Sequence, residues 1–163
     1  MAAPRRRARL PTVEILMQSP LWKKEPQAET TVREAVTAAA DMLSTGPSEV
    51  SIVLTGDSDM QKLNRKWRGI DKPTNVLSFP AAKIAGGGLL GDIVIAYETI
   101  RRECDDEDKD FLHHLAHLTV HGFLHLLGYD HETDAQAEAM ERLESKIMAR
   151  MKMPDPYLAR DLG

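Results

Sequence analysis

Four short stretches of the chain have hydrophobic and polar residues in the pattern of β-strands. The first has the apolar residues Val13, Ile15 and Met17 at every second position, which is typical of a strand. The second is rich in β-branched residues, the third lies between Pro73-Thr74 and Pro80, and the fourth follows a glycine turn at residues 86 to 88. The pattern predicts strands over Thr12 to Gln18, Glu49 to Leu54, Asn75 to Phe79 and Leu89 to Tyr97.

Between these stretches, apolar residues recur at the three- and four-residue spacing of α-helices. The longest such segment, Asp108 to Leu127, is apolar on most sides and is therefore expected to be central and buried. Thr133 and Gln136 have the spacing of a capping box, which starts the last helix. Helices are predicted over residues 30 to 43, from Asp57 or Ser58 to about Trp67, over 99 to about 103, over 108 to 127 and from 133 onward.

These elements predict an α/β (α+β) fold, with about four strands in a mixed sheet packed with helices. A chain of 163 residues without internal repeats or a long linker fits one domain. We expect a flexible basic N-terminal arm over residues 1–11, a single catalytic domain over 12–155 and a C-terminal tail over 156–163.

Composition narrows the class of protein. No apolar run approaches the roughly 20 residues of a membrane span, and no apolar segment follows the arginines of the N-terminal arm as it would in a signal peptide. The single cysteine excludes an intramolecular disulfide and favours a reducing compartment, so a cytoplasmic protein without a membrane partner is predicted.

The net charge of -4 excludes a basic signature over the whole chain. Locally, however, a basic cluster lies in one predicted helix and directly after it, at Lys62, Arg65, Lys66 and Arg68. This cluster is either a nucleic-acid contact or a solvated helix face.

Residues 121 to 131 carry the strongest chemical signal. They read His-Gly-Phe-Leu-His-Leu-Leu-Gly-Tyr-Asp-His. His121 and His125 are one helical turn apart and project from the same face. Gly128 can end the helix in a left-handed conformation, which allows His131 to return to the same point. Three imidazoles with one open position describe a catalytic zinc site, with one Zn²⁺ per chain.

Four histidines, at positions 114, 117, 121 and 125, lie within about 80° of one another on the long helix. A single buried histidine is more often a hydrogen-bonded core residue, but a row of imidazoles favours a metal site because each would need a polar partner. Zinc suits imidazole best, although nickel, copper and iron also bind nitrogen. The candidate hydrogen-bond partners of the metal-binding imidazoles, which would fix their tautomers, are Asp130, Asp92 and His117.

The ligand spacing also matches the metzincin protease motif, His-Glu-x-x-His-x-x-Gly-x-x-His. Here Gly122 stands where those enzymes have their general-base glutamate. A metalloprotease would therefore need another carboxylate as its base.

Two further stretches accompany the histidine motif: Asn64 to Pro80, which includes Arg68-Gly69-Ile70-Asp71-Lys72-Pro73-Thr74, and Leu90 to Ile95. Together with residues 121 to 131 they resemble the bacterial YbeY family of endoribonucleases. The resemblance implies cleavage of single-stranded RNA in ribosomal RNA processing, notably 3′ maturation of 16S rRNA, and ribosome quality control. It implies that His121, His125 and His131 bind zinc and that Arg68 is needed for activity. It also implies the small ribosomal subunit, one of its proteins and the Era GTPase as partners.

The residues fit that chemistry, with alternatives open. Arg68 has a fork of donors that suits phosphate, but it can equally form a salt bridge with Asp71. Lys62, Arg65 and Lys66 are candidate RNA contacts, whereas Trp67 is expected in the core. The attacking group is either hydroxide or the 2′-OH of the RNA. A ribosome-assembly factor with structural zinc, or less favourably a metalloprotease, is the alternative function.

Overall fold

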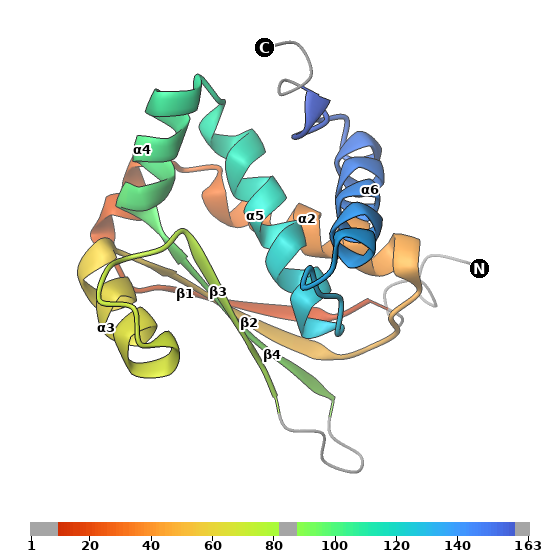
Figure 1. Cartoon of the computed structure of the whole chain (residues 1–163), viewed down its shortest axis with the longest axis horizontal. Helices are drawn as coiled ribbons and strands as arrows, with labels where there is room; N and C mark the ends of the chain where they lie inside the picture. The colour runs from red at the N-terminus through yellow and green to blue at the C-terminus, as the bar shows by residue number, and fades with distance from the viewer. Residues whose placement is uncertain (1–9, 82–87, 159–163) are drawn as a thin grey trace.

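The computed structural model describes residues 10–81 and 88–158, which form a four-stranded mixed sheet covered by helices (Figure 1). The strands are β1 (Thr12–Met17), β2 (Glu49–Thr55), β3 (Val76–Pro80) and β4 (Leu89–Ala96). The helices are η1 (Pro20–Lys24), which is a 3₁₀ helix, and α2 (Ala28–Leu43), α3 (Asp57–Arg68), α4 (Tyr97–Glu107), α5 (Phe111–Leu126) and α6 (Asp134–Arg150). The predicted fold class is confirmed. The predicted basic arm lies outside the described residues apart from Leu10 and Pro11.

The strand order is β1-β2-β4-β3. β1, β2 and β4 are parallel, whereas β3 pairs with β4 in the antiparallel sense. η1 and α2 lie in the connection from β1 to β2, and α3 and β3 lie in the connection from β2 to β4. Among the described residues β3 therefore forms one edge of the sheet, with a neighbouring strand on one side alone.

The two faces of the sheet pack against different helices. Ile93 and Ile95 of β4 belong to the main core, which also contains buried residues of α2, α5 and α6. Val94 and Ala96 point to the other face, where they pack with Met60 of α3. Figure 1 shows the same division, with α2, α5 and α6 on one side of the sheet and α3 on the other.

α5 is the central helix, as its pattern predicts. It contacts α2, α4, α6 and the strands β3 and β4, and Leu115, Val120, Phe123 and Leu124 are fully buried. The capping box predicted at Thr133 and Gln136 is present at the start of α6. α4 is longer than predicted, because Tyr97, Ile100 and Cys104 give it a continuous buried face.

Candidate metal centre and cleft

His121 and His125 of α5 are partly exposed, whereas Gly122, the residue next to His121, packs against the sheet. Gly122 lies so close to β3 and β4 that a Cβ atom there would stand 3.0 Å from Ile93 Cγ2 and from Ser78 Oγ. Ser78 Oγ also donates a hydrogen bond to the Gly122 carbonyl at 3.1 Å. The position next to His121 therefore faces the sheet, and a glutamate there would clash with the sheet instead of reaching a substrate.

The chain turns back after α5 as predicted. Gly128 has a φ of +100°, and the N–H of Tyr129 bonds to the Leu124 carbonyl at 3.1 Å, which ends the helix. This turn returns His131 to the first two histidines. One ligand nitrogen from each of His121, His125 and His131 lies within 4.8 Å of the other two. The structure thus brings together the three residues that the spacing predicts.

The hydrogen bonds of the first two rings leave their outer nitrogens free to bind a metal. His121 Nδ1 faces a carboxylate oxygen of Glu144 at 2.8 Å, and His125 Nδ1 faces the Tyr129 carbonyl at 3.0 Å. Both Nδ1 atoms face acceptors, so in neutral rings both carry the proton and both Nε2 atoms carry a lone pair.

These two Nε2 atoms are 3.1 Å apart. Two lone pairs at that distance repel each other unless a cation binds both. Tetrahedral zinc with bonds of about 2.05 Å places its ligand nitrogens about 3.3 Å apart, close to the observed separation. Burial, and then the neighbouring His121 and His131, lower the pKa of His125, which favours the neutral form that binds metal. The donor set therefore fits a zinc ion.

Glu144 of α6 is a hydrogen-bond partner of His121 that the sequence pattern did not predict. Its side chain is buried, and it accepts hydrogen bonds from His121 Nδ1, from His117 Nε2 at 2.6 Å and from the Tyr157 hydroxyl. Burial alone would raise its pKa, but the bonds from His117 and His121 outweigh that effect and lower the pKa to about 2. In the sequence, Glu144 stands out because it is a charged residue within the apolar stripe that runs from Met140 to Ile147.

The first residues of the predicted C-terminal tail are held against α6. Asp155 accepts hydrogen bonds from Ser145 Oγ and from the Tyr157 N–H, both at 2.9 Å, and so holds this segment against α6. Tyr157 then reaches Glu144, and its hydroxyl lies 3.2 Å from His117 Nε2. His117 therefore contacts the Glu144 carboxylate, which also binds His121. Residues 159–163 of the predicted tail lie outside the described residues.

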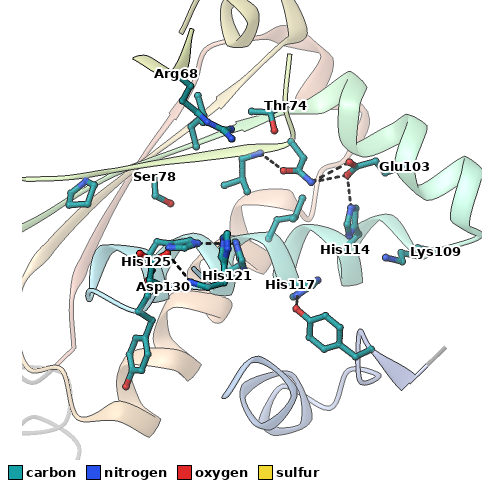
Figure 2. A pocket seen from close by; sticks show the side chains of 18 of the residues that line it. Arg68, Thr74, Ser78, Glu103, Lys109, His114, His117, His121, His125 and Asp130 are labelled. Carbon is teal, nitrogen blue, oxygen red and sulfur yellow. Dashed lines mark hydrogen bonds and ion pairs between the residues drawn. The ribbon is translucent and has the colours of Figure 1, made fainter. Parts of the chain in front are cut away.

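The three histidines line a cleft of about 760 Å³ between α5 and the edge strand β3. Arg68, at the end of α3, lines the same cleft, and Figure 2 shows it on the side opposite the histidines of α5. Within the described ranges Arg68 forms no ion pair, and Asp71 instead accepts a hydrogen bond from Gln61 at 3.1 Å. Its guanidinium is therefore available to an anionic ligand.

The other two candidates for a supporting acceptor are placed differently. Asp130 lines the cleft but accepts the backbone N–H of His131 at 2.8 Å, so it fixes the loop and not an imidazole tautomer. Asp92 is exposed and shares its sheet face with Val94, on the side of α3, because neighbouring strand residues alternate between faces. The structure therefore does not bring Asp92 to the histidines.

The candidate RNA contacts lie on the exposed surface of α3. Lys62, Arg65 and Lys66 are exposed and do not line the cleft; Lys62 pairs with Asp59 at 3.9 Å. Trp67 is 60% exposed, so its expected place in the core is wrong. The short α3 packs on the sheet through Met60 and Leu63, whereas Trp67, near the end of the helix, contacts Phe79 of the edge strand β3 and stays exposed.

A second polar group lines the cleft beyond the histidines. The Glu103 carboxylate bonds to His114 Nε2 at 2.8 Å and to Asn75 Nδ2 at 3.1 Å (Figure 2). Burial would raise the pKa of Glu103, but His114 and Asn75 lower it below its ordinary value. His114 is therefore hydrogen-bonded to Glu103 and does not join the group formed by His121, His125 and His131.

The family model for the endoribonuclease YbeY matches residues 17–152. The chain belongs to the YbeY family. It is 54% identical over 159 residues to the endoribonuclease YbeY of Rhodopseudomonas palustris strain BisB18, and 52% identical over 161 residues to that of Bradyrhizobium sp. strain BTAi1. In both cases 93% of this chain and 95% of the relative are covered.

A solution structure of a Thermotoga maritima protein has the same fold. It aligns with a TM-score of 0.59 and 22% identity, over 86% of this chain and 92% of that one. The predicted membership of YbeY and the predicted enzyme class, an endoribonuclease, are confirmed by the family match. None of the helices over the described residues is long and apolar enough to cross a membrane.

Proposed function

We propose that this YbeY protein is a zinc-dependent endoribonuclease that cleaves single-stranded RNA. The observation that carries the proposal is the pair of facing Nε2 atoms of His121 and His125, 3.1 Å apart, in a cleft that Arg68 also lines. A three-histidine centre opposite an arginine suits a phosphodiester, and the relatives named endoribonucleases supply the substrate class.

His121, His125 and His131 would hold the ion, with Glu144 and the Tyr129 carbonyl fixing the first two rings. When bound, zinc offers positive charge to a phosphoryl oxygen and lowers the pKa of a coordinated water towards neutrality. The negative charge of Glu144 makes the His121 ring a better donor to a cation.

Arg68 would bind the scissile phosphate. Its planar guanidinium can donate two parallel hydrogen bonds to phosphate oxygens, and it stands in the cleft without a competing carboxylate partner among the described residues. It would therefore orient the phosphate and stabilise the charge that develops on its oxygens.

The edge of β3 offers a backbone donor on the same cleft. The Ala96 N–H bonds to the Asn75 carbonyl and the Ala81 N–H to the Leu90 carbonyl, so odd-numbered residues here face β4. Antiparallel pairing alternates, and Ser78 must then direct its N–H away from β4. Since Ser78 lines the cleft, this N–H would donate to a non-bridging phosphate oxygen.

The geometry weighs against the alternative functions. Structural zinc sites are usually closed by four protein ligands, whereas three are found here among the described residues. A metzincin-type protease needs a base beside the first histidine, and Gly122 faces the sheet at that point.

The biological substrate follows from the family. We propose that the enzyme acts in ribosomal RNA processing, including 3′ maturation of 16S rRNA, in the cytoplasm. Its expected partners are the small ribosomal subunit, one of the proteins of that subunit and the Era GTPase.

The proposal is tested by elemental analysis together with an RNA cleavage assay. We expect stoichiometric zinc and cleavage in the wild type, loss of both in His121→Ala, and loss of cleavage with zinc and fold retained in Arg68→Glu. The product ends identify the nucleophile, since attack by the 2′-OH leaves a 2′,3′-cyclic phosphate. Wild-type activity in highly purified Arg68→Glu would refute the assignment.

A further inference from the structure

Trp67 is a large aromatic side chain that the fold leaves on the surface. It is 60% exposed, whereas Trp22, the other tryptophan of the chain, is fully buried and donates its indole N–H to the Thr55 carbonyl. Trp67 contacts Phe79 of β3 edge-on, with ring centroids 5.9 Å apart. The ring therefore packs against Phe79 while much of its surface remains accessible.

A cation lies against this ring, in a basic stretch of the chain. The Lys66 ammonium lies 5.2 Å from the centroid of the Trp67 ring, and Arg65 and Arg68 nearby in the sequence are exposed. Residues 60 to 70 include four basic residues and no acidic one. A fixed, exposed aromatic ring among cations is the arrangement that binds single-stranded nucleic acid, because bases stack on the ring while phosphates meet the positive charges.

Trp67 also lies next to the cleft. Arg68, which lines the cleft, follows it directly in the sequence. On the other side, its contact Phe79 stands between Ser78 and Pro80, both of which line the cleft. A strand that leaves the cleft over the edge of β3 thus meets the indole.

We propose that Trp67 stacks on a base of the RNA strand outside the scissile phosphate, and that this contact contributes to the preference for single strands. The inference rests on the proposed ribonuclease function. A base in a duplex is stacked on its neighbours and paired, so its face is not available to the indole. An unpaired base presents a free face whatever its identity, so the contact selects single strands without selecting sequence.

Tryptophan fluorescence tests the contact without cleavage. His121→Ala protein is titrated with a short mixed-sequence single-stranded RNA, with the same RNA annealed to its complement, and with a strand in which abasic sites replace the nucleotides in turn. We expect quenching by the single strand, little by the duplex, and loss of quenching at one abasic position. Trp22 is buried and supplies a constant background. Equal quenching by duplex and single strand would overturn the proposal.

Binding and kinetics of variants complete the test. Trp67→Ala should weaken single-strand binding about tenfold and raise KM with kcat little changed, whereas Trp67→Phe should retain most of both. Leu16→Ala is the matched control, because Leu16 is 59% exposed on β1 at the opposite edge of the sheet. Unchanged RNA binding by Trp67→Ala would reject stacking and assign the exposed ring to a protein contact.

The two proposals fail separately. If the wild type does not cleave RNA but Trp67→Ala still loses RNA binding, the ribonuclease function is refuted and the stacking contact stands. If the wild type cleaves RNA and Trp67→Ala matches it in KM, the stacking contact alone falls.

Discussion

Glu144 on α6 accepts a hydrogen bond from His121 Nδ1 on α5 at 2.8 Å, although the two residues are 23 positions apart. The same carboxylate accepts hydrogen bonds from His117 Nε2 and from the Tyr157 hydroxyl. The buried Glu144 side chain therefore connects α5, α6 and the segment after α6 next to the candidate metal centre. This arrangement links metal affinity to the stability of the fold.

Replacing Glu144 by Gln should lower zinc affinity by about 10- to 100-fold. Glutamine has no negative charge and one acceptor oxygen, so it cannot accept all three donors that the carboxylate binds. Competition with a chromophoric zinc chelator measures the change. Glu138→Gln, an exposed change on the same helix, serves as the control and should leave the affinity as in the wild type.

Acid should destabilise the metal-free protein through Glu144. The pKa of this carboxyl is lowered from 4.5 to about 2, so its contribution to stability is complete above about pH 4.5 and is lost as the pH falls towards 2. The expected loss is about 3 kcal/mol, and it should be absent from Glu144→Gln. Urea unfolding of both proteins at a series of acidic pH values gives the difference. Parallel pH profiles for the two proteins would contradict it.

The fold and the first ligands could be predicted from the sequence because they depend on local pattern. His121 and His125 share a helical face by spacing alone, and Gly128 marks the turn that returns His131. The place of Asp92 needed the structure, because Val94 and Ala96 on its face of β4 are as apolar as Ile93 and Ile95 on the other, so the sequence does not show which face meets α5.

Glu144 and Trp67 needed the structure. Whether a charged residue in the stripe of α6 meets α5 depends on how the two helices pack, which the sequence of either helix does not determine. Trp67 lies at helical spacing from Met60 and Leu63, on the face of α3 that meets the sheet. It comes near the end of the helix, however, where it contacts Phe79 of the edge strand β3 and stays 60% exposed, and the sequence pattern does not show where the sheet ends.

Arg68→Lys should keep the fold and the zinc but lower kcat by about 100-fold. Lysine retains the positive charge, whereas the paired, planar donors that match phosphate are lost. Arg68 is exposed and has no ion-pair partner among the described residues, so its replacement should leave the melting temperature unchanged. Single-turnover cleavage and zinc analysis on the same preparations measure both effects. Retention of wild-type kcat would show that charge alone suffices.

The outward N–H of Ser78 can be removed by proline without breaking the sheet. Proline is tolerated at edge positions whose N–H does not join the ladder, and the chain already has Pro80 at the equivalent outward position two residues on. Ser78→Pro should therefore fold, bind zinc and lose about 100-fold in kcat, if this N–H donates to the phosphate in the transition state.

Two matched variants separate the effect of this N–H from other changes at the edge of β3. Ser78→Ala removes the hydroxyl that bonds to the Gly122 carbonyl but retains the N–H, so it should cleave RNA nearly as well as the wild type. Leu77→Pro removes an N–H that faces β4 and should unfold the strand. Circular dichroism and zinc content establish folding before the rates are compared. Equal loss of kcat in Ser78→Ala and Ser78→Pro would assign the effect to the hydroxyl and its bond to α5, and not to the backbone donor.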